Sequence, residues 1–226
     1  MIDVELLRGG LVVSCQAYPG EPLRDPDVTA RTARAVVAGG ARAVRVQGLS
    51  DVRATVAAVD APVIGLWKDG GSDVFITPTL RHAQGVAEAG AHVVALDGTR
   101  RARPDGLTLA ETIARLKAAH SVLVMADCGS AADAREAEAA GADILGTTLA
   151  GYSGERPKTI GPDLELIKQI TSECSAPVMA EGRIHRPEDA AAAITAGAFS
   201  VCVGTAITHP TTITGWFREA VEGGRR

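Results

Sequence analysis

The sequence predicts an α/β fold, a single-domain (β/α)8 TIM barrel that spans residues 1–226. Short, nearly continuous apolar runs alternate with amphipathic segments, as strands buried on both faces of a parallel sheet alternate with helices. Glycine–alanine pairs recur where a helical segment gives way to an apolar run. No linker and no shift in composition divides the chain, so we expect one domain.

The predicted strands are the apolar runs, which are rich in valine, isoleucine, leucine and alanine. In chain order they cover residues 10–16, 43–48, 62–68, 93–99, 123–128, 144–151, 177–184 and 200–207.

Helical patterns fall between these strands, and a last one follows the final strand. Gly39, Gly90, Gly141 and Gly197 each stand near a predicted helix end, where glycine provides the common C-terminal cap. The predicted helices cover residues 25–38, 50–58, 80–89, 107–119, 131–140, 162–173, 187–196 and 210–221.

Eight such units in about 220 residues match the compact end of the range for (β/α)8 barrels. An open, doubly wound sheet is the alternative architecture. No Gly-x-Gly-x-x-Gly sequence follows the first predicted strand, and this absence argues against a dinucleotide-binding sheet.

Polar residues stand at the C-terminal ends of the predicted strands, which is where barrels of this type carry their active sites. The set contains a lysine, two arginines, several acids and several amide or hydroxyl side chains. In chain order these are Gln16, Arg45, Gln47, Lys68, Asp97, Thr99, Asp127, Thr147, Thr148, Glu181, Arg183 and Thr205.

The seventh predicted strand ends in Glu181-Gly182-Arg183 after an apolar run, which puts a carboxylate where burial is expected. An unpartnered buried carboxylate is costly, so we expect cationic partners from other strands. Either an internal ion pair that orders the barrel or a functional site would explain the residue.

Glycines near the ends of the last two strands favour a phosphate site there. Gly182, Gly204 and Thr205 stand in the loops after strands seven and eight, which often bind phosphate through backbone N–H groups. Glycine allows the backbone to approach a ligand closely.

The composition excludes several classes of protein. The formal net charge is −4 and aromatic residues make up 3% of the chain, so no nucleic-acid partner is expected. No apolar stretch approaches the roughly 18 residues that span a membrane, and no basic region resembling a signal peptide opens the sequence. The four cysteines lack metal-ligand spacing, and we interpret them as buried thiols of a cytoplasmic protein.

Five motifs follow one another along essentially the whole chain: LVVSCQ (11–16), FITPT (75–79), GTTLAGY (146–152), AEGRI (180–184) and VGTAIT (203–208). Together and in this order they resemble the N-acylglucosamine-6-phosphate 2-epimerase family. The resemblance implies a phosphate-binding barrel that interconverts N-acetylmannosamine 6-phosphate and N-acetylglucosamine 6-phosphate in amino-sugar and sialic acid catabolism. It implies no metal and no organic cofactor.

The resemblance also assigns roles to residues. Lys68 and Glu181 match the catalytic lysine and glutamate of the family. Gln16, Arg45 and Asp127 match residues of the family that contact the substrate. Tyr152 and Arg183 stand within the two most specific motifs, GTTLAGY and AEGRI, and are also expected at the substrate. Three positions depart from the family pattern: Gln47 replaces Glu or Asn, Asp69 replaces an Arg after the lysine, and His209 replaces an Arg after the last strand.

The chemistry requires removal of the C2 proton next to the C1 aldehyde and its return on the other face. An ordinary lysine, with a pKa of about 10.4, is protonated at neutral pH, so Lys68 needs burial or a nearby cation to act as a base. We therefore expect Lys68 and Glu181 to act as a coupled proton-transfer pair. A Schiff base on Lys68 is the alternative.

Two other functions fit part of this pattern. One is a different sugar-phosphate barrel, such as an aldolase or ribulose-phosphate 3-epimerase. The latter would need metal ligands, and His82, His92 and His120 are instead expected at the surface. The other is an amino-sugar-phosphate binding protein without catalysis. A homodimer is expected from the resemblance, and Trp216 and Phe217 are candidates for its interface or for the core.

Overall fold

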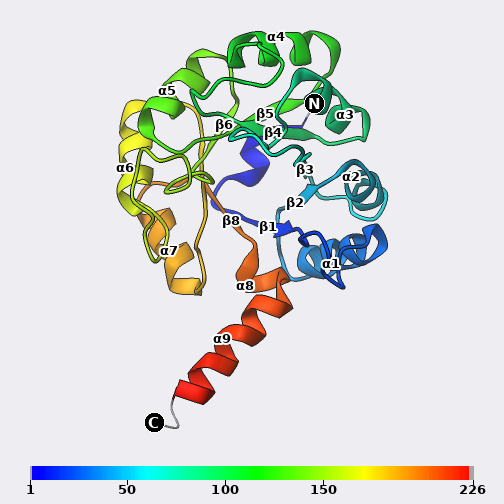
Figure 1. Ribbon diagram of the computed structural model, residues 1–226, viewed down its shortest axis with the longest axis vertical. Helices are drawn as coiled ribbons and strands as arrows, with labels where there is room; N and C mark the ends of the chain where they lie inside the picture. Colours follow the sequence, from blue (N-terminus) through cyan, green and yellow to red (C-terminus); the bar gives the residue numbers. More distant parts are fainter. Residues whose placement is uncertain (1, 224–226) are drawn as a thin grey trace.

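In the computed structural model, which describes residues 2–223, eight parallel strands pair in chain order. The last strand pairs with the first and closes the barrel (Figure 1). The strands are β1 (Leu11–Cys15), β2 (Ala43–Gln47), β3 (Val63–Leu66), β4 (Val93–Asp97), β5 (Leu123–Asp127), β6 (Ile144–Gly146), β7 (Val178–Glu181) and β8 (Ser200–Val203). The predicted (β/α)8 barrel is thus confirmed.

Helices follow the strands and surround most of the barrel (Figure 1). They are α1 (Pro26–Ala38), α2 (Leu49–Val56), α3 (Leu80–Glu88), α4 (Leu109–Ala119), α5 (Ala131–Ala139), α6 (Leu164–Glu173), α7 (Pro187–Thr195), α8 (Thr205–Thr208) and α9 (Pro210–Gly223). A short 3-10 helix, Val4–Leu7, precedes β1 and adds Leu7 to the barrel core.

Alternation along each strand divides the apolar residues into two cores. One set fills the barrel interior and includes Ile64, Met125 and Met179, while the other packs between the sheet and the helices. The strand register then aligns the polar strand ends: Asp97 pairs with Asp127, Asp127 with Gly146, and Glu181 with Cys202. The functional groups therefore meet at one rim of the barrel.

Every strand is shorter than the sequence predicts, and five of them end two or more residues early. β3 ends at Leu66, β4 at Asp97, β6 at Gly146, β7 at Glu181 and β8 at Val203. After Gly204 the chain turns into α8, so residues 205–207, which were predicted as strand, are helical. An apolar run fits a buried strand and a buried helical turn equally well, and this ambiguity explains the error.

The four cysteines are free thiols. Burial raises the pKa of Cys15 to about 12 and holds the pKa of Cys128 and of Cys202 well above the ordinary thiol value. These thiols are therefore unreactive apolar packing groups, as their sequence context indicates.

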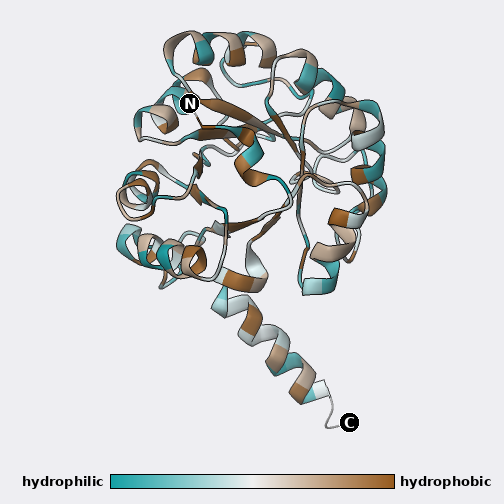
Figure 2. Ribbon diagram, turned by 180° about the vertical axis from the view of Figure 1, so that it is seen from behind, coloured by the Kyte–Doolittle hydropathy of each residue, from teal (hydrophilic) through white to brown (hydrophobic). Residues whose placement is uncertain are grey.

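Helix α9 projects away from the barrel (Figure 1), and its Trp216 ring still contacts His185 of the barrel, with the ring centres 4.7 Å apart. None of its described residues is buried, although apolar positions recur along it as they do along the strands (Figure 2). Trp216 and Phe217 are 36% and 70% exposed, so they do not belong to the core of their own barrel. Among residues 2–223, no helix is long and apolar enough to cross a membrane.

Candidate active site

A cavity of about 610 Å³ opens at the rim formed by the strand ends. Most of the residues predicted for the site line it: Gln16, Lys68, Tyr152, Glu181, Gly182, Arg183, Gly204 and Thr205. Arg45 and Asp127 are fully buried and contact Glu181 or its partners. The structure therefore brings every predicted site residue to one end of the barrel.

Arg45 is the centre of a buried ion-pair cluster. Its guanidinium donates two parallel hydrogen bonds to the Asp127 carboxylate, at 3.1 and 2.6 Å, and a third to Glu181. The Arg45 side chain is 1% exposed, that of Asp127 0% and that of Glu181 14%. Burial alone would lower the pKa of Arg45, but the two carboxylates raise it, so the guanidinium stays charged.

Local sequence features create space for this cluster. Residues at β2 positions 45 and 47 point away from Val44 and Val46, as alternation requires. A Cβ on Gly146 would lie 3.1 Å from Asp127 Oδ1 and 3.2 Å from the Thr148 hydroxyl. The absence of a side chain there allows Thr148 to donate to Asp127 (2.6 Å) and to accept from Arg45 (3.2 Å).

Glu181 ends β7 and faces both the cluster and the cavity. Burial raises its pKa above the ordinary carboxyl value, the Arg45 guanidinium opposes that shift, and the Asp127 charge adds to it. The Thr147 hydroxyl accepts from the Glu181 N–H (3.0 Å) and donates to the Glu181 C=O (2.9 Å), and these bonds fix the Glu181 backbone. This carboxylate is thus held rigidly beside a permanent cation.

Lys68 lies two residues beyond β3, opposite Ile76 in a short antiparallel bridge. Burial lowers its pKa, and the Arg45 charge lowers it further, while Glu181 and Asp127 oppose the shift. Its Nζ lies 5.9 Å from the centre of the Tyr18 ring. Burial and a neighbouring cation are the two conditions that the sequence argument set for a basic lysine.

Gln16 lines the cavity from the end of β1. Its amide nitrogen donates to Ser14 Oγ at 2.8 Å, while its buried Oε1 has no hydrogen-bond partner within residues 2–223. Buried acceptors without partners are uncommon, and this one lies at the cavity wall. A ligand hydroxyl or amide would satisfy it.

Gly182, Gly204 and Thr205 lie together at the rim between β7 and β8. Gly182 has a φ of 108°, a conformation that residues with side chains rarely adopt. A Cβ on Gly204 would lie 3.2 Å from the Ser14 Cβ, so glycine allows close packing against β1. Thr205 begins α8 directly after Gly204.

Tyr152 belongs to the loop that follows β6, and Arg183 stands two residues after the end of β7. The Arg183 guanidinium donates to Ala150 O (2.8 Å), Thr159 Oγ1 (3.0 Å) and Gly161 O (3.1 Å), and it lies 5.5 Å from the Tyr152 ring centre. Arg183 therefore ties this loop to the end of β7, and both side chains border the cavity.

His209, which replaces an arginine of the family pattern, borders the cavity beside Gly204 and Thr205, but both of its ring nitrogens are already hydrogen-bonded within the protein. It is 7% exposed, its Nε2 pairs with Glu21 at 2.9 Å, and its Nδ1 bonds Thr212 Oγ1 at 2.6 Å. Its ring also contacts Tyr18 edge to face. Nε2 thus holds the β1–α1 loop, and Nδ1 bonds the first turn of α9. Gln47 lies beside the Arg24 guanidinium, and its amide oxygen accepts from Arg24 when the amide is oriented to satisfy both groups.

The sequence argument missed Tyr18 and Arg101, which line the cavity, and gave no specific role to Thr148, which bridges Arg45 and Asp127. Thr148 stands in a motif that had been singled out, whereas Tyr18 and Arg101 lie in loops where no pattern marks them. The sequence argument also misplaced one residue outside the cavity. His82 was predicted at the surface but is only 6% exposed, so that prediction is wrong.

Comparisons with known proteins give one consistent result. A family model described as "Putative N-acetylmannosamine-6-phosphate epimerase" (NanE) matches residues 29–223. A Cutibacterium acnes protein named "Putative N-acetylmannosamine-6-phosphate 2-epimerase" is 63% identical over 217 residues, covering 95% of each chain. A protein of the same name from Caldanaerobacter subterraneus is 45% identical over 214 residues, covering 93% of this chain and 90% of the relative.

Comparison with a solved structure indicates the same family. The N-acetylmannosamine-6-phosphate 2-epimerase from Clostridium perfringens superimposes with a TM-score of 0.92 at 35% identity. The match covers 96% of this chain and 95% of the other.

Proposed function

The chain belongs to the N-acetylmannosamine-6-phosphate epimerase family, and from this premise we propose that it inverts C2 of N-acetylmannosamine 6-phosphate to give N-acetylglucosamine 6-phosphate. The observation that carries the proposal is Lys68. A partly buried lysine whose pKa is lowered lies in the same cavity as Glu181, and the charged, buried Arg45 pairs with that Glu181. This set supplies a proton carrier and positive charge in a largely desolvated site.

The proposed reaction begins with the open-chain sugar. Neutral Lys68 takes the proton from C2, the C–H electron pair moves into the C1–C2 bond, and negative charge develops on the C1 oxygen. The ammonium just formed and the Arg45 guanidinium stabilise that oxygen. Lys68 and Glu181 titrate as a coupled pair, and the proton returns to the other face of C2 through this pair.

We assign substrate binding to the remaining cavity groups. Gly182, Gly204 and Thr205 hold the phosphate at the rim, and Gln16 Oε1 accepts a hydrogen bond from the sugar. The rest of the site is formed by two further pairs of side chains. Arg45 and Asp127 provide its charged base, and Arg183 and Tyr152 form part of its wall. The reaction needs neither a metal nor an organic cofactor, so EDTA should leave the activity unchanged.

Proton NMR in D₂O tests the proposal. With N-acetylmannosamine 6-phosphate, we expect inversion at C2 together with entry of solvent deuterium at C2. Exchange without inversion would indicate a different proton-transfer barrel, and binding without exchange would indicate a non-catalytic binding protein. Borohydride added during turnover should trap no adduct, whereas a trapped adduct would support a Schiff base on Lys68.

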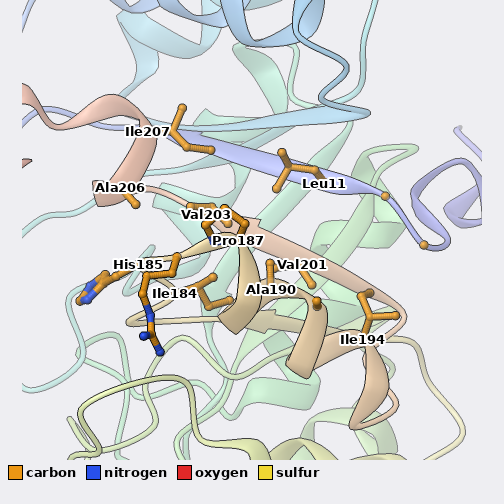
Figure 3. A pocket seen from close by; sticks show the side chains of 14 residues that line it. Leu11, Ile184, His185, Pro187, Ala190, Ile194, Val201, Val203, Ala206 and Ile207 are labelled. Atoms are coloured by element: carbon orange, nitrogen blue, oxygen red, sulfur yellow. The ribbon is translucent and has the colours of Figure 1, made fainter.

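The protein also carries an uncovered apolar groove, which supports our proposal that it forms a homodimer. The groove has a volume of about 440 Å³ and lies between α7 and the start of β1, in the part of the helix ring where only the short α8 stands (Figure 1). Aliphatic side chains line it, among them Leu11, Ile194, Val201 and Ile207 (Figure 3). Ile194 and Ile207 are 41% and 43% exposed.

We propose that α9 of a second copy fills this groove. Ile213, Trp216, Phe217 and Val221 recur at helical spacing and form an apolar face on α9 that its own barrel does not bury. The chain's own α9 is directed away, because His209 accepts a backbone bond from Ile213 and is itself fixed to Glu21. An exchanged pair of helices would cover both grooves through one two-fold contact.

Light scattering at micromolar concentration tests the dimer. We expect twice the mass of the 23.2 kDa chain for the wild type and a monomer for Phe217→Ser. Leu6→Ser is the matched control, since Leu6 is also more than half exposed but lies in the helix before β1. A monomeric wild type would show that α9 covers no second copy.

We further propose that the protein works in the cytoplasm. Four free cysteines, three of them buried, fit a reducing compartment.

A further inference from the structure

The segment that carries Lys68 is not part of the barrel ladder. β3 ends at Leu66, and Trp67, Lys68 and Asp69 run antiparallel to Phe75, Ile76 and Thr77 in a small hairpin. Two backbone bonds close it, Thr77 N–H to Trp67 O at 2.8 Å and Asp69 N–H to Phe75 O at 3.0 Å. A lysine beyond the end of its strand needs another restraint to keep a fixed position.

His82, in the first turn of α3, contacts the residues on both sides of Lys68. Its ring packs edge to face on Trp67, with the ring centres 4.4 Å apart. Its Nε2 lies 2.9 Å from the Asp69 carboxylate, and its Nδ1 lies 2.6 Å from Thr79 Oγ1. The Thr79 hydroxyl donates to Nδ1, which leaves Nε2 to donate to Asp69.

Helix α3 is built to receive this hairpin. Gly85 lies one turn after His82, and a Cβ there would lie 3.4 Å from the Trp67 ring. That distance is an ordinary van der Waals contact, so α3 lies close to the indole at this point. The His82 bond and the Gly70 N–H lower the pKa of Asp69, so this carboxylate stays ionised and accepts.

We propose that His82 is a positioning residue for the epimerisation, which clamps Trp67 and Asp69 and so fixes the amine of Lys68 in the cavity. The proposal rests on the proposed function. It adds a residue from α3 that does not line the cavity and a partner, Asp69, at one of the positions where the chain departs from the family pattern.

Catalysis is sensitive to such a clamp because proton transfer requires short distances. A displacement of about 1 Å can cost on the order of 10² in rate. Release of the hairpin would also let water reach Lys68 and weaken the desolvation that lowers its pKa. The charged groups that face Lys68 are Arg45, Glu181, Asp127 and Arg24, and none of them lies on the hairpin or on α3.

Two substitutions of His82 distinguish the role of its Nε2 bond to Asp69 from that of its Nδ1 bond to Thr79. In His82→Gln the terminal amide can still donate to Asp69, whereas in His82→Asn the shorter side chain reaches only Thr79. We expect kcat to fall about 10- to 100-fold in His82→Asn, with KM within about twofold of the wild type, and to recover at least in part in His82→Gln. The lysine inflection in the kcat–pH profile should move upward in His82→Asn, towards the ordinary value.

Asp69 provides a test that leaves the buried histidine in place. Asp69→Ala should lower kcat as His82→Asn does, and the double variant should be no worse than the worse single one. Asp73→Ala is the matched control, an exposed acid in the same hairpin. All rates are compared at temperatures well below each variant's Tm.

The outcomes distinguish the clamp from the function on which it rests. A wild type without deuterium exchange at C2 would overturn the proposed function. An active wild type whose Asp69→Ala and His82→Asn variants keep both kcat and the pH inflection would overturn the clamp alone. A loss that appears only as lowered Tm or raised KM would make His82 a packing residue and would also overturn it.

Discussion

Arg45 is the buried cation with which both carboxylates of the ion-pair cluster interact. It is buried with two carboxylates around it, and its Nε has no hydrogen-bond partner within residues 2–223. Removing one member of a buried ion pair typically costs about 3–5 kcal/mol, because the remaining charge stays desolvated. The cluster is therefore fixed before substrate arrives, which suits a site that must stabilise a developing charge.

Lys68 should be indispensable for turnover. Replacing it with alanine should lower kcat by about 10²–10⁴, the usual contribution of a positioned acid–base group, while fold and phosphate binding survive. Circular dichroism checks that the variant keeps its fold, and a substrate-binding measurement checks that it still binds the phosphate. Turnover like that of the wild type would remove Lys68 from the mechanism.

The lowered pKa of Lys68 also predicts the pH dependence. The amine must be neutral to take the C2 proton, so kcat should rise with pH through an inflection below 10.5, the ordinary lysine value. Deuterium entry at C2, measured across the pH range, gives the profile. An inflection at or above 10.5 would mean that burial and Arg45 do not tune this lysine.

Thr148 should contribute more to stability and to kcat than expected for a half-buried side chain. Thr148→Val removes the hydroxyl that donates to Asp127 and accepts from Arg45, and should cost about 1–3 kcal/mol of stability together with part of kcat. Urea unfolding and steady-state kinetics measure the two effects. Thr195→Val, on the exposed face of α7, should change neither; equal effects in both variants would contradict the role of Thr148.

At the scale of single residues, the sequence predicted which charged side chains pair better than it predicted which polar side chains are buried. A carboxylate at the end of an apolar strand requires a cation, and alternation directed Arg45 towards it. The burial of His82 was not predictable, because it depends on the Asp69 hairpin, and a loop hairpin leaves no periodic signal.

At the scale of elements, the β1–α1 loop is fastened from the far end of the chain. Glu21 accepts the Tyr18 N–H at 2.7 Å and pairs with His209, just before α9. Tyr18 thereby borders both Lys68 and the cavity. The sequence predicted both segments but not their contact, because 188 residues separate Glu21 from His209.

Releasing this loop should weaken substrate binding. Glu21→Ala removes the acceptor for both Tyr18 and His209, and we expect KM to rise about five- to tenfold with a smaller change in kcat. Glu5→Ala, which breaks an exposed ion pair with Arg8 at the other end of β1, is the control and should leave KM unchanged. An unchanged KM in Glu21→Ala would show that the loop does not need this anchor.

At the scale of the whole molecule, eight repeated units were enough to predict the barrel, and the strand order follows from it. The position of the last helix was not predictable. Its amphipathic pattern shows that α9 needs a partner surface, but the pattern is the same whether that surface belongs to its own barrel or to another.

The proposed dimer predicts that stability depends on protein concentration. Because association stabilises only the folded chain, Tm should rise as protein concentration increases from low to high micromolar. Calorimetry at several concentrations measures this dependence. It should disappear in Phe217→Ser and persist in Leu6→Ser; a Tm independent of concentration in the wild type would contradict the dimer.

The outward course of α9 has a consequence for how a newly made chain matures. Its residues leave the ribosome after all eight strands, so the barrel can close around β1 and β8 while the groove beside them is still open. In the proposed dimer, completing the helix ring is then a second-order event, which depends on meeting another nascent or finished copy. Until that meeting, each new chain exposes an apolar groove and an apolar helix, the kind of surface that chaperones recognise.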